Sequence, residues 1–288
     1  MHGIFVSNAY LQGDKFGEPP TMFSAAADRL GIGLDLVRNS DLIVPAGDSE
    51  ALRKAIGEPD FILFWDKDVR CASNLELCGC RVFNTSECIR VCDDKWLTHL
   101  ALKRRGVPTI DTSSCPLSFG DYTDLGFLED AADRFGFPLV VKENFGSFGM
   151  QVHLVEDMDS LKGLFDGPYV PRIIQKYVPC GGSDVRVEVV GGSAVAAMER
   201  HAAPGEFRSN ATLGGSIRGR TPTDEESELA ISACDAVGAD FAGIDIMRSE
   251  EGNLVCEVNS NAHLRNLLDC TGTDGSEAIL LHIRDVIG

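Results

Sequence analysis

The sequence predicts an α/β domain followed by two α+β lobes. Short apolar segments alternate with helical segments through the first part of the chain, whereas after residue 184 successive strands are joined by tight turns. Strands that alternate with helices are typical of a parallel sheet covered on both faces. A chain of 288 residues is also too long for one small core. We therefore predict three domains, over residues 1–92, 93–178 and 179–288.

The first domain is predicted to be a small doubly wound sheet. Strands are expected over residues 3–7, 34–38 and 61–65, and helices over residues 21–31 and 48–56. Thr21 is the expected N-cap of the first helix, and Gly31 its end. Asp48 or Ser49 is the expected cap of the second helix. No GxGxxG motif follows the first strand, so the sequence does not predict a dinucleotide site there.

The middle lobe begins with a helix that starts at Asp93 or Asp94 and ends at Gly106, with Pro108 beyond it. Strands are expected over residues 138–144, 151–156 and 172–178, and a helix over residues 157–165. The loop NFGSFG joins the first two of these strands, and its glycines allow the backbone to turn closely around a ligand.

The last lobe is predicted to consist mainly of hairpins. Strands are expected over residues 184–190, 193–201, 241–247 and 254–258, and helices over residues 223–238 and 276–286. The glycine pair at 191–192 and the segment SEEGN are the expected turns. Thr223 is the expected N-cap of the longer helix, because acidic residues follow it in the first turn.

The composition excludes some classes of partner. The formal net charge is −18, which disfavours nonspecific binding to nucleic acid or to an anionic membrane. The excess of acid is explained by solubility alone, but it also leaves room for a basic partner or for divalent cations. The N-terminal residues do not resemble a signal peptide, and no apolar run reaches membrane-spanning length. We therefore expect a cytoplasmic protein, and the sequence leaves open whether it forms a homo-oligomer.

The cysteines are expected to be reduced thiols, as is usual in the cytoplasm. Five of the ten lie close together, at residues 71, 78, 80, 88 and 92. Their spacing contains one CxC and one CxxxC but no paired CxxC motifs, so a zinc or iron–sulfur site is not predicted.

The last hairpin carries three polar residues that point to a metal site. Side chains alternate along a strand, so Glu257 and Asn259 share one face. A turn centred near Glu251 places Asp245 directly opposite Glu257, with Cβ atoms about 5 Å apart. Carboxylate and amide oxygens are the ligands that Mg²⁺ prefers. The alternative is two solvated carboxylates at the edge of the sheet, but their apolar neighbours make an unpaired charge costly and favour the metal.

Lys142 is a candidate phosphate ligand. It ends an apolar strand and precedes the NFGSFG loop, so one ammonium group and several backbone N–H groups come together. No GxxxxGK[ST] motif occurs, so this is not a P-loop. A lysine that extends from a strand end into water is an equally good interpretation of this segment alone.

Two further pairs of residues are candidate anion ligands. Asp184 and Arg186 share one strand face, and so do Arg208 and Asn210 in EFRSN. Arginine binds phosphate or carboxylate oxygens bidentately. Taken singly, each pair is better explained as a surface ion pair.

The order of these motifs resembles the ATP-grasp superfamily and, more narrowly, the RimK-like α-L-glutamate ligases. The matching segments are CDDK (92–95), PLVVKENFGSFGMQV (138–152), IIQKYV (173–178), SDVRVEVVGGSAVAAMERHAAPGEFRSN (183–210), AGIDIM (242–247) and CEVNSN (256–261). They span the C-terminal two thirds of the chain, and their order is as specific as their residues. The resemblance implies an ATP-grasp fold, in which an N-terminal domain precedes two lobes that enclose the nucleotide.

The resemblance also implies an ATP-dependent carboxylate–amine ligase that forms an acylphosphate and then an amide. It implies nucleotide contacts from Lys95, Lys142, Lys176, Tyr177, Asp184, Arg208, Ser209 and Asn210. It implies contacts with the reacting groups from Arg186, Arg208 and Asn210. It implies that two Mg²⁺ or Mn²⁺ ions are held by Asp245, Glu257 and Asn259. ATP, an amino acid such as glutamate, and a carboxylate acceptor on a peptide, a protein tail or a metabolite would be the substrates.

Two departures from the family pattern concern the substrate. Many relatives have Pro-Gly where this chain has Ala262 and His263, and many have Arg where it has Leu213 before a glycine pair. His263 and Arg265 are candidates for binding an anionic substrate group, or are surface residues at a helix start. A ligase that makes a dipeptide or a cofactor amide, and a nucleotide-binding regulatory module without catalysis, are the alternatives.

Overall fold

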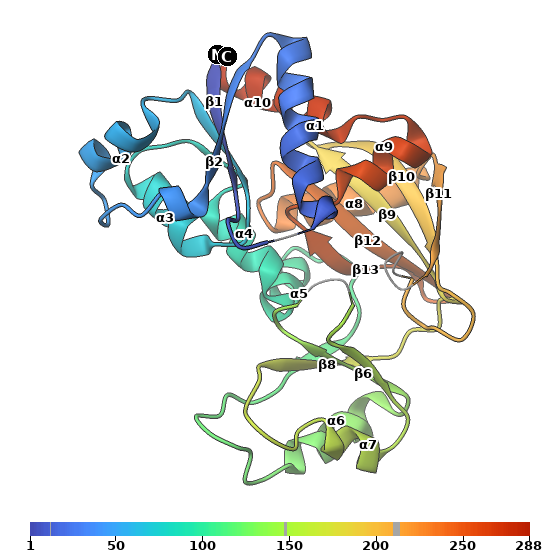
Figure 1. Cartoon of the computed structure of the whole chain (residues 1–288). Helices are drawn as coiled ribbons and strands as arrows, with labels where there is room; N and C mark the ends of the chain where they lie inside the picture. Colours follow the sequence, from blue (N-terminus) through green and yellow to red (C-terminus); the bar gives the residue numbers. More distant parts are fainter. Residues whose placement is uncertain (12, 147–148, 210–213) are drawn as a thin grey trace.

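The N-terminal sheet is parallel, and it confirms the predicted α/β start of the chain (Figure 1). The computed structural model describes residues 1–11, 13–146, 149–209 and 214–288. The strand order is β2-β1-β3-β4, with β1 at His2–Ser7, β2 at Gly33–Arg38, β3 at Phe61–Trp65 and β4 at Val82–Phe83. The three predicted strands are confirmed to within one residue at each end. β1 and β3 are mainly apolar runs, whereas β2 also contains Asp35 and Arg38.

Helices cover both faces of this sheet. They are α1 (Asp14–Leu30), α2 (Ser49–Ile56), α3 (Val69–Leu77) and α4 (Ser86–Asp93), with a short 3-10 helix η1 at Asn39–Asp41. Helix α1 packs Phe23 against Phe5 on one face, whereas α2 and α3 pack against Ile4 and Ile62 on the other. A strand that is buried on both faces must be apolar at every position, which is the pattern of β3.

Helix α1 begins at Asp14 rather than at Thr21, so the predicted N-cap is wrong. Thr21 lies inside the helix and donates its hydroxyl to the carbonyl of Gly17, 3.0 Å away. The proline pair at 19–20 also lies inside the helix, although proline normally breaks a helix. Because of these prolines, the helix was predicted to begin only at Thr21. Gly31 ends the helix with φ of 67°, as predicted.

Helices α3 and α4 occupy the cysteine-bearing segment, where the sequence predicted no element. Cys88 and Cys92 are buried in α4, and their sulfurs lie 3.9 Å apart. Cys88 belongs to the core that α4 shares with the C-terminal sheet. At these two positions cysteine therefore serves as a small hydrophobic side chain.

The central lobe is an antiparallel sheet with helices on one face. Its strand order is β5-β8-β6-β7, with β5 at Thr112–Ser114, β8 at Arg172–Lys176, β6 at Leu139–Glu143 and β7 at Val152–Val155. Helices α6 (Gly126–Phe135) and α7 (Met158–Gly163) bury their apolar sides against it. Helix α5 (Lys95–Arg104) leads into this lobe, and the side chain of Asp94 accepts hydrogen bonds from the first turn. Asp94 is thus the N-cap, one of the two predicted candidates.

The C-terminal sheet is antiparallel and carries most of the predicted site. Its strand order is β11-β10-β9-β12-β13, with β9 at Ser183–Val190, β10 at Ser193–His201, β11 at Ser216–Arg220, β12 at Phe241–Ser249 and β13 at Gly252–Asn259. Helix α8 (Asp224–Ala236) covers one face and begins with a capping box between Thr223 and Glu226, as the acidic first turn predicted. Helices α9 (Leu264–Thr271) and α10 (Gly275–Ile287) complete the chain.

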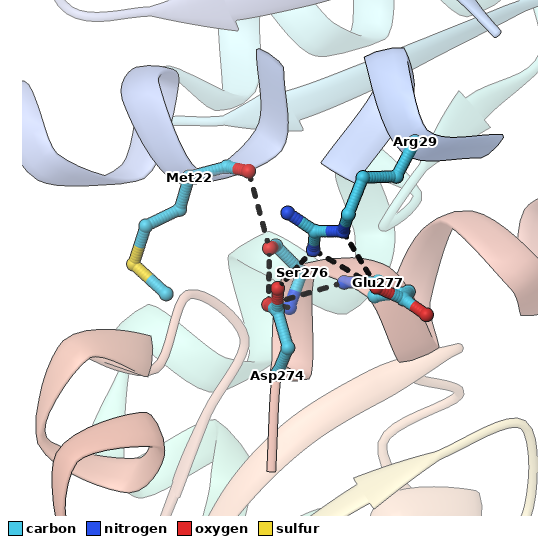
Figure 2. A network of polar contacts seen from close by, with 5 residues as sticks. All are labelled: Met22, Arg29, Asp274, Ser276 and Glu277. Carbon is cyan, nitrogen blue, oxygen red and sulfur yellow. Dashed lines mark hydrogen bonds and ion pairs between the residues drawn. The ribbon is translucent and has the colours of Figure 1, made fainter. Parts of the chain in front are cut away.

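The two ends of the chain are packed together. Helix α10 lies beside α1, and the two helices share a core with the first sheet (Figure 1). Figure 2 shows Arg29 of α1 between Asp274 and Glu277, while the Ser276 hydroxyl donates to the Met22 carbonyl at 3.3 Å. The N-terminal domain is therefore fixed to the C-terminal lobe by both apolar and polar contacts.

The central lobe stands apart from the rest of the molecule and is reached through α5 (Figure 1). Leu102 of α5 and Val107 pack into the core of the C-terminal sheet, whereas the sheet of the central lobe has a core of its own. Across the described residues, we find no helix of the length and hydrophobicity needed to cross a membrane.

Candidate active site

The β12–β13 hairpin places Asp245 directly opposite Glu257, which confirms the predicted pairing. Gly243 lies opposite Asn259 in the same register, so Asp245, Glu257 and Asn259 share one face of the sheet. A bulge after Asp245 shifts the pairing by one residue between that point and the turn. The predicted register therefore holds where the candidate ligands lie and fails nearer the turn.

Asp245 is held by two arginines. It is 4% exposed, and Arg186 on the neighbouring strand binds it bidentately, with Nε 2.6 Å from Oδ1 and Nη2 2.7 Å from Oδ2. Arg200 adds a contact of 2.9 Å between Nη2 and Oδ2. Burial alone would raise the pKa of Asp245, but the two guanidinium groups lower it to about 2. Asp245 is therefore ionised near neutral pH.

Arg200 is a member of the site that the sequence did not predict. It lies opposite Asp184 in the β9–β10 hairpin and binds it bidentately, at 2.7 Å (Nε–Oδ1) and 2.6 Å (Nη2–Oδ2). Pairing counted outward from the glycine turn would place Glu199 opposite Asp184. A bulge between Ala194 and Ala196 shifts the register by one residue and brings Arg200 there instead. Asp184 and Arg186 do share one face, but each is engaged by a partner from another strand.

The two predicted phosphate lysines face the metal-ligand strand. Lys142 is the last residue but one of β6, is 9% exposed, and places Nζ 3.6 Å from Sγ of Cys256. Lys95 lies at the start of α5, and its Nζ is 3.3 Å from the carbonyl of Gly146 in the glycine loop. Burial lowers the pKa of Lys95, while the nearby charge of Glu257 opposes that change. The structure thus brings the predicted phosphate ligands to the predicted metal ligands.

The donor set of the hairpin suits a hard cation. Glu257 is half-buried, and its carboxylate has no hydrogen bond or ion pair within the described residues. Asp245 Oδ1 accepts one hydrogen bond and so keeps a second lone pair. Among the described residues no group of three or more His, Cys, Asp or Glu side chains is placed to hold a metal. A cation here would therefore need the Asn259 amide oxygen and phosphate oxygens as further ligands.

Arg208 lies beside the glycine loop, and neither Arg208 nor the buried Ser209 is in a strand. The predicted strand face of EFRSN is wrong, because residues 206–209 are irregular and follow a turn at Pro204. Arg208 folds back onto the carboxylate of Glu206 and donates through Nη1 to the carbonyl of Gly149, at 2.6 Å. The Arg208 guanidinium lowers the pKa of Glu206 to about 2. Asn210, which was expected to act with Arg208, lies outside the described residues.

Lys176 and Tyr177 lie at the end of β8, between the central lobe and the last hairpin. The ammonium of Lys176 lies 2.9 Å from Glu251 in the hairpin turn, and its backbone N–H donates to the carbonyl of Asp111. Both residues are partly buried. Their expected contact with adenine through the backbone stays a prediction.

A buried histidine joins the two lobes, which the sequence did not predict. His99 Nδ1 lies 2.8 Å from the hydroxyl of Thr109, which itself donates to the carbonyl of Val255 in β13. Thr109 must then accept from His99, so the proton lies on Nδ1 and Nε2 accepts from the amide of Gln175 in β8, at 2.7 Å. Thr112 accepts the other amide hydrogen of Gln175. Every donor in this hydrogen-bond network therefore has an acceptor when His99 is neutral.

We expect acid to destabilise the fold through His99. Burial lowers its pKa to about 3, and the charge of Lys142 adds to this. In the unfolded chain His99 binds a proton near pH 6.5, whereas in the folded chain it stays neutral at that pH. The free energy of unfolding therefore falls as the pH falls below that value. Between pH 7 and pH 5 the loss should be about 2 kcal/mol. Urea unfolding at both values, beside His99→Gln, tests this: the variant should lose less stability, and an equal loss would contradict it.

The segment SNAHLRN (260–266), which contains the candidate substrate ligands His263 and Arg265, docks the C-terminal lobe on the N-terminal domain. Asn261 donates to the carbonyl of Asp66 at 3.0 Å, and the buried Asn84 donates to the carbonyl of Ser260 at 3.1 Å. His263 Nε2 lies 3.4 Å from the carboxylate of Glu18. Arg265 lies on the first turn of α9, 3.9 Å from Asp269. The segment therefore serves an interface between domains, and its role in substrate binding stays a prediction.

Comparison with known proteins gives one family. Residues 92–283 match the RimK-like ATP-grasp domain. Human N-acetylaspartylglutamate synthase A is 36% identical over 201 residues, which are 68% of this chain and 50% of that protein. A probable alpha-L-glutamate ligase of Xanthomonas axonopodis pv. citri (strain 306) is 36% identical over 218 residues, which are 74% of this chain and 72% of that protein. The chain thus spans about half the length of the human synthase.

The fold also has a solved counterpart. D-alanine–D-alanine ligase from Bacillus anthracis, determined in complex with ATP, superposes with a TM-score of 0.73. The match covers 100% of this chain and 97% of that one, at 20% sequence identity. At that identity the likeness establishes the ATP-grasp fold, including an N-terminal domain outside the segment that matches the family.

Proposed function

Because the chain belongs to the RimK-like ATP-grasp family, we propose that it is an ATP-dependent carboxylate–amine ligase that joins L-glutamate or a similar amino acid to a carboxylate acceptor. The observation that carries the proposal is that Lys95 and Lys142 lie beside the row of Arg186, Asp245 and Glu257, of which Asp245 is buried. These residues come from four segments far apart in the sequence: α5, β6, β9 and the β12–β13 hairpin. They gather more positive than negative charge around one face of the sheet, as a triphosphate requires.

The chemistry of this reaction explains why charge is needed. A carboxylate is a poor electrophile, so the γ-phosphoryl group of ATP must first be transferred to it. The amine nitrogen then attacks the acyl carbon, the bond from that carbon to the phosphate oxygen breaks, and phosphate leaves with the electron pair. Positioning and neutralisation of the phosphates supply most of the catalysis in such transfers. We assign this work to Lys95, Lys142 and Arg208.

Arg186 and Arg200 are proposed to prepare the site rather than to bind the nucleotide directly. They hold Asp245 ionised and fixed in position, so its carboxylate needs no reorganisation when a cation arrives. Asp245, Glu257 and Asn259 would hold Mg²⁺ or Mn²⁺. The cation would neutralise charge on the phosphates as they transfer.

The substrates are proposed from the relatives. The two relatives above are named for an N-acetylaspartylglutamate product and for L-glutamate. Glutamate is therefore the first amino acid to test, and small carboxylates and peptide C-termini are the first acceptors. The domain boundaries at residues 92 and 178, and a cytoplasmic location, remain part of this proposal.

The test is ATP-dependent amide formation by the full chain. We expect ADP and phosphate to be released only when Mg²⁺ or Mn²⁺, a carboxylate acceptor and an amino acid are all present, and mass spectrometry to show the amide. Binding of ATP that raises the melting temperature, without ADP release for any pair, would instead support a regulatory nucleotide-binding module. If nucleotide leaves the melting temperature unchanged, both interpretations are wrong.

A further inference from the structure

Glu188 is a buried acid that the proposed mechanism does not use. It lies on β9 and is 1% exposed, on the same strand face as Asp184 and Arg186. Within the part of the chain that the structure describes, its carboxyl group makes no hydrogen bond and no ion pair. A buried carboxyl group without a partner is costly, so its presence calls for an explanation.

The backbone directs Glu188 into the site. Glu188 pairs with Gly243 and Gly243 pairs with Asn259, so these three residues form a row across the sheet. A Cβ atom added to Gly243 would lie 3.1 Å from Oε2 of Glu188 and 2.8 Å from the Cβ of Ala262. The Glu188 side chain therefore occupies the space above the glycine, toward Asn259, and Ala262 adjoins it. Any side chain at residue 243 would fill this space.

This row lies next to the row that carries the proposed phosphate chemistry. Arg186, Asp245 and Glu257 are each two residues along their strands from Glu188, Gly243 and Asn259. Two residues along a strand correspond to about 7 Å, so a substrate group bound at Glu188 would lie within the length of a small amino acid from the proposed phosphate row. Arg186, the cation nearest to Glu188, is already bound bidentately by Asp245. Within the described residues the chain therefore offers Glu188 no counter-ion of its own, and a positively charged substrate group would supply one.

On the basis of the proposed ligase function, we infer that Glu188 binds the ammonium group of the incoming amino acid, takes up one of its protons, and leaves the neutral nitrogen oriented toward the acyl carbon of the acylphosphate. The chemistry of recognition is a carboxylate receiving a primary ammonium group inside a water-poor site. Burial raises the pKa of Glu188 to about 8, and an ammonium partner would lower it again. Glu188 is thus a binding residue for the amine substrate. Formation of the acylphosphate from ATP and the carboxylate does not need Glu188.

The test separates the two half-reactions. Hydroxylamine is a neutral nucleophile near pH 7, and it converts an acylphosphate to a hydroxamate without an ammonium group to be bound. We expect Glu188→Gln to raise the KM for the amino acid about tenfold and to lower the ratio of amide to hydroxamate by a similar factor, with the KM for ATP changed less than twofold. Glu228→Gln, which removes an exposed acid from α8, should keep the ratio of the wild-type protein.

Three results decide the inference. The inference would be overturned by an unchanged KM for the amino acid in Glu188→Gln, or by an equal fall in amide and hydroxamate. Glutamine has the shape of glutamate, so if Glu188 only filled space, the variant would show no effect specific to the amino acid. If the wild-type protein forms no hydroxamate with any carboxylate, the proposed function fails and this inference fails with it. We expect Glu188→Gln to melt no lower than the wild-type protein, because it removes a buried ionisable group. If it does not fold, Glu188→Asp takes its place and should raise the same KM.

Discussion

Replacement of Glu257 by glutamine is expected to lower the rate of amide formation about 10²- to 10³-fold, which is the range for the loss of one preorganised charge-stabilising group. Within the described residues no arginine engages the Glu257 carboxylate, which lies directly opposite Asp245. Glutamine keeps its shape but removes the negative charge that a divalent cation needs. Phosphate release measured at several Mg²⁺ concentrations should show that more metal is required for half-maximal activity.

The control for this experiment lies in the same hairpin. Glu250→Gln changes an exposed acid in the turn and should leave both turnover and the Mg²⁺ requirement unchanged. The melting temperature of Glu257→Gln should remain close to that of the wild-type protein, because Glu257 is only half-buried and its carboxylate has no hydrogen-bond or ion-pair partner among the described residues. Near-normal turnover in Glu257→Gln would refute a metal-binding role for this residue.

Replacement of Arg200 by methionine is expected to cost about 3–5 kcal/mol of stability. Its guanidinium is shared by Asp184 and Asp245, and the three side chains are each only 6–12% exposed. Methionine fills similar space but leaves the two carboxylates with Arg186 alone between them. A buried charge that loses its partner is penalised far more than an exposed one. Urea unfolding at pH 7 measures the difference in the free energy of unfolding.

The pH dependence gives this prediction a second readout. In Arg200→Met the two carboxylates are poorly compensated, so their pKa values rise and protonation relieves the penalty. The gap in stability between variant and wild-type protein should therefore be largest near pH 7 and should shrink as the pH falls toward 4. Arg218→Met on the neighbouring strand β11 removes an exposed arginine and should change stability by less than about 0.5 kcal/mol. A gap independent of pH would show that lost packing, rather than lost charge, explains the cost.

The candidate metal ligands illustrate what local pattern predicts well. Alternation along a strand and the position of a turn placed Asp245 opposite Glu257, because both rules depend only on neighbouring residues. The helix caps at Asp94 and Thr223 followed from equally local chemistry. The start of α1 was missed because prolines normally disfavour the interior of a helix, and the pair at 19–20 lies inside one.

The bulges illustrate what local pattern misses. One extra residue in β10 brings Arg200 rather than Glu199 to Asp184 and so exchanges a repulsive pair for an attractive one. No residue in this segment signals a bulge. The bulge changes only which residues of β9 pair with those of β10, so it cannot be recognised from β10 alone. Glu188 was missed for a related reason, because its burial depends on Gly243 and Ala262 from two other segments.

By itself the sequence determined most of the strands, which hairpin carries the carboxylates and to which family the order of motifs belongs, because these features depend on short-range chemistry. It missed the strands β4, β5 and β11, and it predicted a strand through EFRSN, where residues 206–209 are irregular. The tertiary structure decided which charges meet. It brings Lys142 against Cys256, 114 residues later, and joins β8 to β13 through His99. It also turns SNAHLRN toward the N-terminal domain. Such contacts depend on how whole sheets pack, and a single side chain gives no local signal of the partner that packing will provide.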